Sequence, residues 1–119
     1  MENKNKRQIG TCYEKMAATY LRQKGLEIVV CNYRCRFGEI DIIAKEKDVI
    51  VFFEIKYRKD ADKGLPLEAV TKKKQRIISR CAAAYLGHTR CTDCAVRFDV
   101  IGILGEEIVW LRNAFEYQG

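Results

Sequence analysis

The segment 49–57 constrains the fold most, because it is an almost uninterrupted run of β-branched and aromatic residues. Two charged residues, Glu54 and Lys56, interrupt this run, and their spacing places both side chains on one face of a strand. Burying ions in this way costs several kcal/mol for each ion, unless the ions are paired or bind a metal. The segment therefore predicts a buried strand that carries either an internal ion pair or a functional site.

A second strand is predicted at 38–44, one short charged turn before the first. Two strands joined by so short a turn form an antiparallel hairpin. Asp41 interrupts the apolar residues of the second strand, and in the hairpin it is expected to lie opposite or diagonal to Glu54. Strand alternation predicts that one face of this strand carries Ile40, Ile42 and Ala44.

The remaining segments show helical or strand periodicity. Apolar residues at helical spacing, each set followed by a glycine, predict helices at 9–24 and from residue 67 or 71 to 86. Runs rich in strand-forming residues predict strands at 26–31, 95–103 and 107–111, whereas 32–37 is predicted to be a polar turn. We therefore expect an α/β fold, ordered helix, three strands, helix, two strands, with a mixed sheet of about five strands flanked by helices. The length favours one domain over 1–119.

Asp41 and Glu54 supply ligands for a hard cation. Two close carboxylates repel each other unless one takes a proton or a divalent cation neutralises them. Oxygen ligands without histidine or cysteine favour Mg²⁺ or Mn²⁺ over zinc. Lys56 beside them would position or deprotonate a water molecule, or stabilise charge on a phosphate. This set is sufficient for phosphodiester hydrolysis, and a simple ion pair between Glu54 and Lys56 is the alternative.

The net charge of +6 favours a phosphate-rich partner. Short basic clusters supply the candidate nucleic-acid-binding residues, which are Arg34, Arg36, Arg58, Lys59, Lys72, Lys73 and Lys74. The alternative is that these clusters are separate solvated faces. The chain has no apolar run long enough for a membrane span and no apolar stretch near its N-terminus, so a cytoplasmic protein without a membrane partner is expected.

Six cysteines are present, and a chain in a reducing compartment is not expected to depend on disulfides. Cys12 and Cys81 fall on apolar helical faces, where cysteine behaves as a small hydrophobic residue. Cys91 and Cys94 form a C-x₂-C pair, for which a structural zinc site or a redox role is the less favoured alternative.

Five motifs are spread along nearly the whole chain. They are NYR at 32–34, RFGEIDIIA at 36–44, VFFEIKYR at 51–58, GLPLEAV at 64–70 with Lys74 and Gln75 after it, and LRNAF at 111–115. Together they resemble the YraN-like family of uncharacterised bacterial proteins. That family is grouped with the PD-(D/E)xK, or restriction-endonuclease-like, nucleases and is most similar to the archaeal Holliday-junction resolvases.

The resemblance implies a restriction-endonuclease-like fold and a divalent-metal-dependent endonuclease that acts on DNA, with branched or structured DNA as one candidate substrate. It implies that Asp41 and Glu54 bind the metal, that Lys56 assists the attack and that Glu14 completes or tunes the metal site. A homodimer is an open possibility, because resolvase-like relatives cut two strands symmetrically.

The resemblance also suggests that Lys74 or Gln75 faces the substrate phosphate. Two alternatives to the nuclease remain open. One is a nucleic-acid-binding protein that retains the fold without cleaving, and the other is a structural or regulatory protein in which the ion pair only mimics a site.

Overall fold

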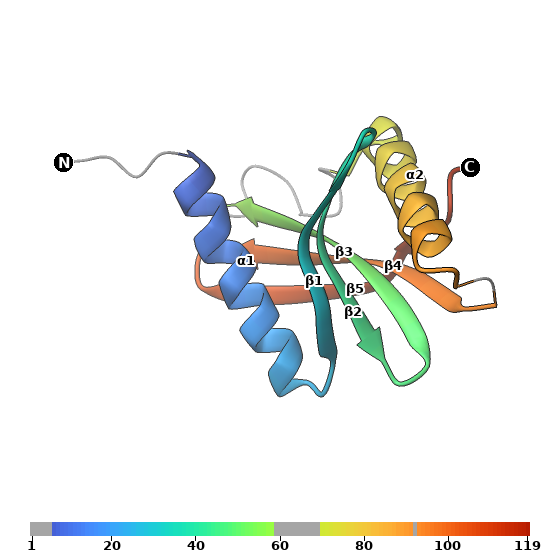
Figure 1. Cartoon of the computed structure of the whole chain (residues 1–119). Helices are drawn as coiled ribbons and strands as arrows, with labels where there is room; N and C mark the ends of the chain where they lie inside the picture. Colours follow the sequence, from blue (N-terminus) through green and yellow to red (C-terminus); the bar gives the residue numbers. More distant parts are fainter. Residues whose placement is uncertain (1–5, 59–69, 92) are drawn as a thin grey trace.

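A five-stranded mixed sheet with one helix on each face forms the centre of the molecule (Figure 1). The computed structural model describes residues 6–58, 70–91 and 93–119, with the backbone alone for 6–11. The elements are α1 (Lys6–Gln23), β1 (Glu27–Cys35), β2 (Gly38–Glu46), β3 (Val49–Arg58), α2 (Lys72–His88), β4 (Ala95–Leu104) and β5 (Glu107–Phe115). The predicted α/β class and order of elements are confirmed.

The strands lie in the order β1-β2-β3-β4-β5. All neighbours are antiparallel except β3 and β4, which are parallel and are connected through α2. A parallel pair needs such a crossover, whereas antiparallel neighbours are joined by short turns. The predicted hairpin is formed by β2 and β3, in which Ile42 pairs with Phe53 and Ile43 with Phe52.

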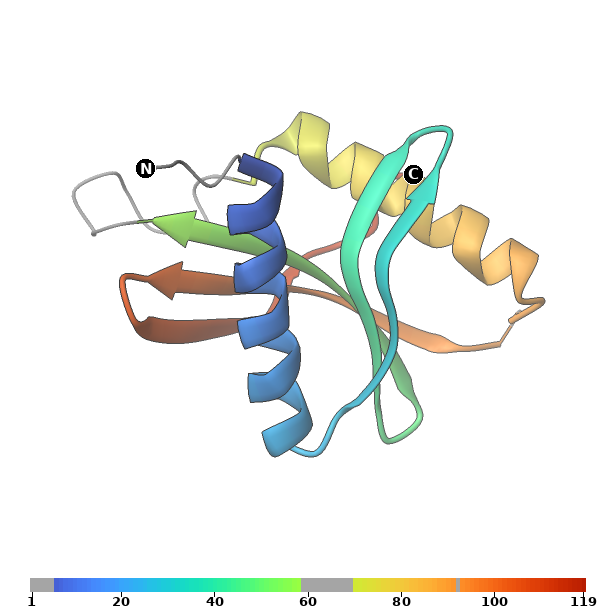
Figure 2. The same ribbon diagram turned by 60° about the vertical axis from the view of Figure 1, so that its left-hand side comes forward.

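Two hydrophobic cores lie on opposite faces of the sheet. Leu21 of α1 packs in one core with Phe53 of β3, and Ile78 of α2 packs in the other with Phe52. Because successive strand residues point to opposite faces, the neighbours Phe52 and Phe53 serve different helices. In Figure 2, α1 crosses in front of the sheet, while the β1–β2 hairpin lies in front of α2. Neither of the two helices in the described part of the chain is long and apolar enough to cross a membrane.

The prediction of a polar turn at 32–37 is wrong, because β1 continues to Cys35 and pairs there with Gly38 of β2. Its outer part alternates polar and apolar residues, and Tyr33 and Cys35 pack against the core beneath α2. The alternation of a strand was therefore present in this segment, but its polar residues were interpreted as a turn. The same error occurs in β5, which extends beyond the predicted end at Leu111 to Phe115.

Regular alternation along β2 is also wrong at one position. Ile40 packs in the core beneath α2 with Ile43, whereas Ile42 packs in the core beneath α1. The irregularity coincides with Asn32 of β1, which has φ 56° and, in the register of this strand pair, faces Asp41. A left-handed residue interrupts the pleat, so the side chains beyond it change face.

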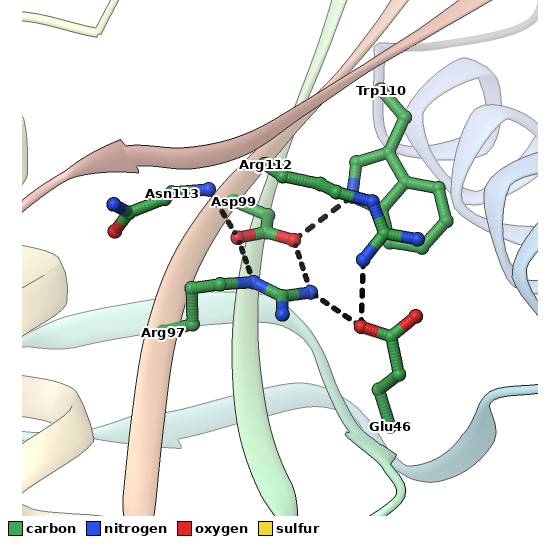
Figure 3. A network of polar contacts seen from close by, with 6 residues as sticks. All are labelled: Glu46, Arg97, Asp99, Trp110, Arg112 and Asn113. Carbon is green, nitrogen blue, oxygen red and sulfur yellow. Dashed lines mark hydrogen bonds and ion pairs between the residues drawn. The ribbon is translucent and has the colours of Figure 1, made fainter.

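A buried carboxylate, Asp99 of β4, joins β4 to β5 at a bulge (Figure 3). Its oxygens accept hydrogen bonds from Arg97 Nε at 2.8 Å and Nη2 at 2.9 Å, and from Trp110 Nε1 at 2.9 Å. Asp99 Oδ1 also accepts from the backbone N–H of Asn113 at 2.8 Å, where φ is 52°. The bulge leaves the backbone N–H of Asn113 without a partner in the strand ladder, and the Asp99 carboxylate accepts its hydrogen bond instead.

Glu46, at the end of β2, continues this network toward solvent (Figure 3). One carboxylate oxygen accepts from Arg97 Nη2 at 2.9 Å and from Arg112 Nη1 at 2.7 Å. The hydrogen bond from Arg112, with a further one from Arg97, lowers the pKa of Glu46. The Arg112 guanidinium also lies 3.7 Å from the centre of the Trp110 ring, so Trp110 belongs to this structural network.

The cysteines differ in part from expectation. Cys91 and Cys94, for which a zinc site or a redox role was the less favoured alternative, form a disulfide. Their short separation allows this bond to close immediately after α2. Cys81 is buried as predicted, whereas Cys12 is exposed because it lies away from the face of α1 that packs on the sheet.

Candidate active site

A polar pocket of about 270 Å³ opens where β3 separates from β2. It is lined by Tyr13, Glu14, Asp41, Glu54, Ile55, Lys56, Tyr57 and Lys74. These residues come from α1, β2, β3 and α2. The pocket thus gathers titratable side chains from four elements at the point where the sheet loses one of its ladders.

Asp41 lies next to β3 at this opening. The β2–β3 ladder ends at the pair Ile42 and Phe53, and one further step in the same register places Asp41 beside Glu54, as the hairpin pattern predicts. Asp41 Oδ2 accepts a hydrogen bond from the backbone N–H of Ile55 at 2.8 Å. This contact replaces a ladder hydrogen bond and fixes the carboxylate against the strand.

The pKa of Asp41 is raised to about 8. Burial is the largest cause, and the negative charge of Glu54 is the next. The hydrogen bond from Ile55 acts in the opposite direction, while contact with the Glu54 carboxylate and the charge of Glu14 raise the pKa further. The site therefore favours an additional positive charge at Asp41, which a proton or a cation can supply.

Glu54 is the buried acid of the site, with a side chain that is 4% exposed. Its Oε2 lies 3.4 Å from Lys56 Nζ and 3.7 Å from Lys74 Nζ. The strand supplies the first lysine and α2 supplies the second, so Glu54 is held by two elements. The simple two-residue ion pair considered from the sequence is thus part of a larger charged cluster.

Glu14 approaches the same pocket from α1. It accepts a hydrogen bond from the side-chain amide of Asn32. Burial raises the pKa of Glu14, the Asn32 hydrogen bond opposes this shift, and the charges of Glu39 and Glu54 add to it. Asn32 is not among the site residues predicted from the sequence. An asparagine inside a strand does, however, indicate the left-handed conformation that Asn32 adopts.

Two tyrosines form an aromatic wall of the pocket. The rings of Tyr13 and Tyr57 stack with centroids 4.0 Å apart and an interplanar angle of 15°. A hydrogen bond with Tyr57, together with burial, raises the pKa of Tyr13 to about 12, so Tyr13 stays protonated at neutral pH. Neither tyrosine is among the predicted site residues, because residues 44 positions apart in different elements give no local signal.

Most other predicted nucleic-acid-binding residues lie outside the pocket. Arg34 pairs with Glu39 at 3.3 Å, and Arg36 lies over the ring of Phe37. Lys72 and Lys73 are exposed at the start of α2. None of these four residues lines the pocket, but Lys72 and Lys73 directly precede Lys74, which does.

Three predicted residues remain to be placed. Arg58 donates to the carbonyl of Tyr57 at 2.9 Å. Gln75 Nε2 donates to the carbonyl of Val70 at 3.1 Å, so Lys74 is the member of the pair Lys74 and Gln75 that lines the pocket. Lys59 lies outside the described residues.

The carboxylates fit a hard cation as a pair. Within 6–58, 70–91 and 93–119, no three or more histidine, cysteine or acidic side chains are close enough to hold a metal ion together. The charge of Glu54 nevertheless raises the pKa of Asp41, and a bound cation would relieve this repulsion. Mg²⁺ is commonly held by one or two carboxylates, with water and substrate phosphate as its other ligands. The part of Glu14 as a further ligand stays a prediction.

The sequence matches a known family over most of its length. Residues 13–103 match the profile of the "Uncharacterised protein family UPF0102". A UPF0102 protein of Lachnoclostridium phytofermentans is 47% identical over 116 residues, which cover 97% of this chain and 98% of that protein. A UPF0102 protein of Caldicellulosiruptor saccharolyticus is 42% identical over 117 residues, covering 93% of this chain and 99% of that protein. The chain therefore belongs to the UPF0102 family, which confirms its resemblance to the YraN-like proteins.

Proposed function

We propose that this member of the UPF0102 family is a divalent-metal-dependent endonuclease that hydrolyses phosphodiester bonds in DNA, with a PD-(D/E)xK-type site. The observation that carries the proposal is the gathering of Asp41, Glu54 and Lys56 in one open pocket. Burial and the charge of Glu54 raise the pKa of Asp41, so holding this carboxylate ionised beside Glu54 costs stability that an apolar residue would not cost. The two carboxylates have a clear use if a cation and a phosphate enter the pocket.

The two carboxylates would hold Mg²⁺ or Mn²⁺, which when bound supplies an acidified water and neutralises charge on the phosphate. Lys56 Nζ is kept on the pocket side of β3 by its contact with Glu54, where it can orient a water or donate to a phosphate oxygen. Lys74 approaches from α2 and supplies a second ammonium group for the same phosphate. The predicted nucleic-acid-binding residues outside the pocket, including Arg36, Lys72 and Lys73, would contact the DNA backbone without reading its sequence.

A second candidate is a nucleic-acid-binding protein that does not cleave. It is favoured by one observation, that Lys56 and Lys74 already pair with Glu54 without a metal. This candidate predicts salt-dependent DNA binding and no metal-dependent turnover.

Glu54→Gln and Lys56→Ala are each expected to lower Mg²⁺- or Mn²⁺-dependent cleavage about a hundredfold or more, because the first removes a carboxylate that would hold the metal and the second removes the ammonium group that would contact the water or the phosphate. The measurement uses labelled single-stranded, duplex, flapped and four-way-junction DNA, which also shows the preferred substrate. Glu107→Gln and Lys45→Ala are matched controls, since both side chains are exposed and lie outside the pocket.

The outcomes separate the candidates. Metal-dependent cleavage that both site variants lose and both controls keep supports the nuclease. Binding with a steep salt dependence but no cleavage by the wild type overturns the nuclease in favour of the binding protein. Neither cleavage nor binding would mean that Glu54 is a structural ion-pair partner only.

A further inference from the structure

Two thiols meet between the tip of the β1–β2 hairpin and α2. The sulfur atoms of Cys35 and Cys81 are hydrogen-bonded at 3.2 Å, although the residues are 46 positions apart in the chain. Neither belongs to the disulfide between Cys91 and Cys94. Sulfur atoms at this separation need to move only about 1 Å to reach the bond length of a disulfide.

The backbone next to Cys35 and Cys81 allows the β1–β2 hairpin and α2 to lie close together. Gly38, which pairs with Cys35 across the hairpin, has φ 150°. A Cβ atom at Gly38 would lie 2.7 Å from the Cγ2 atom of Ile77 and 3.9 Å from the sulfur of Cys81. The absence of a side chain thus lets the hairpin lie directly on α2.

The two thiols differ in their access to solvent. Cys35 is half-buried and lines an open surface pocket of about 390 Å³ with Arg34, Gly38 and Glu39. Cys81 is fully buried behind it. A small reagent can therefore reach Cys35 first, and Cys81 lies where it can react only with Cys35.

The surroundings of the two sulfurs agree with these different roles. Burial alone would raise the pKa of Cys35, but a hydrogen bond with Cys81, hydrogen bonds from the backbone of Phe37 and Gly38, and the charge of Arg36 hold it below its ordinary value. Burial is the main cause that raises the pKa of Cys81 to about 12. Reactive cysteines are accessible, have a low pKa and often lie next to a second, resolving cysteine.

We propose that Cys35 and Cys81 form a reversible thiol–disulfide modification site, in which Cys35 reacts with a small-molecule disulfide and Cys81 resolves the product. The proposal rests on the contact between the sulfurs and on their unequal access. It does not depend on the nuclease activity.

The chemistry proceeds in two exchanges. The Cys35 thiolate attacks one sulfur of oxidised glutathione, so a mixed disulfide forms and one glutathione thiolate leaves and takes a proton. Cys81 then loses its proton and attacks the Cys35 sulfur, which forms the bond between Cys35 and Cys81 and releases the second glutathione. The two protein thiols lose two electrons and two protons in total, and the reagent gains both.

Such a bond would join α2 to the end of β1, the strand that pairs with β2. β2 carries Asp41, and α2 carries Lys74 about two helical turns before Cys81. The oxidised chain would therefore hold the hairpin and the helix in one fixed relation. Its melting temperature is expected to exceed that of the reduced chain.

Peptide mapping tests the proposal directly. The fully reduced protein is incubated with oxidised glutathione, free thiols are blocked, and tryptic peptides are analysed by mass spectrometry. The bond would link the dipeptide 35–36 to the peptide 81–90, whereas a bond between Cys91 and Cys94 stays inside the peptide 91–97. The exposed Cys12 and Cys31 lie in separate peptides, 8–15 and 25–34, and act as internal controls.

The expected result is the linked pair of peptides, its reversal by dithiothreitol and its loss in Cys35→Ser and Cys81→Ser. Cys81→Ser should retain glutathione on Cys35, whereas Cys35→Ser should leave Cys81 as a free thiol. Absence of the linked pair from the wild type would overturn the proposal without any variant. Reaction of Cys12 or Cys31 in preference to Cys35 would overturn it as well.

Discussion

Asp99→Ala is expected to lower the free energy of unfolding by about 3–5 kcal/mol, because it leaves the Arg97 guanidinium without its main partner in a largely buried position. The indole N–H of Trp110 and the backbone N–H of Asn113 lose their acceptor at the same time. Donors that lose their acceptor in this partly buried network add to the cost, so the β4–β5 bulge should open. Urea denaturation followed by circular dichroism measures the change.

The matched control for this variant is Glu107→Ala, an exposed acidic position on β5. It should change stability by less than about 0.5 kcal/mol. Asp99→Asn should fall between the two, since an amide oxygen can still accept from Trp110 but carries no charge for Arg97. A loss below about 1 kcal/mol for Asp99→Ala would contradict the role given to this network.

Asp41→Asn is expected to stabilise the metal-free protein at high pH. The pKa of Asp41 is about 8 in the fold, against an ordinary value of 3.8, so between these values the folded chain binds a proton that the unfolded chain has lost. The stability of the wild type should therefore fall as pH rises through this window, by at most about 1.4 kcal/mol per pH unit. Asparagine cannot ionise, so the variant lacks this decline.

The two proteins should have similar stability near pH 4 and differ by roughly 3–5 kcal/mol at pH 9, with the variant the more stable. Denaturation curves across this range measure the difference, and Asp48→Asn, at an exposed turn position, is the control. If a divalent cation binds at Asp41, its addition at pH 8 should stabilise the wild type and leave the variant unchanged. If the free energy of unfolding of the wild type and of the variant changed with pH in the same way over the whole range, the raised pKa of Asp41 would be contradicted.

The order of the elements and the centre of the site follow from local patterns. The run around Phe52 and Phe53 fixes β3, and the short turn before it fixes the hairpin that brings Asp41 to Glu54. These relations involve residues close in sequence, for which spacing and strand alternation are sufficient.

The features that were missed depend on contacts between distant elements. Asn32 reaches Glu14 across 18 positions, and Asp99 reaches the bulge at Asn113 across 14. Both asparagines adopt the left-handed conformation inside strands, where a periodicity pattern shows only an interruption. The contact between Cys35 and Cys81 could not be predicted from the sequence for the same reason. The two cysteines are close only because α2 packs against the hairpin.

A Mn²⁺ titration, followed by the electron paramagnetic resonance signal of the free ion, tests most directly whether Asp41 and Glu54 form a cation site. The ion would be added at pH 8.5 to the wild type, Asp41→Asn, Glu54→Gln and the control Glu107→Gln. The proposal predicts that the wild type and the control bind Mn²⁺, that Mg²⁺ displaces it, and that both site variants lose this binding. Equal binding by all four proteins, or no binding by the wild type at millimolar Mn²⁺, would contradict a metal site at Asp41 and Glu54.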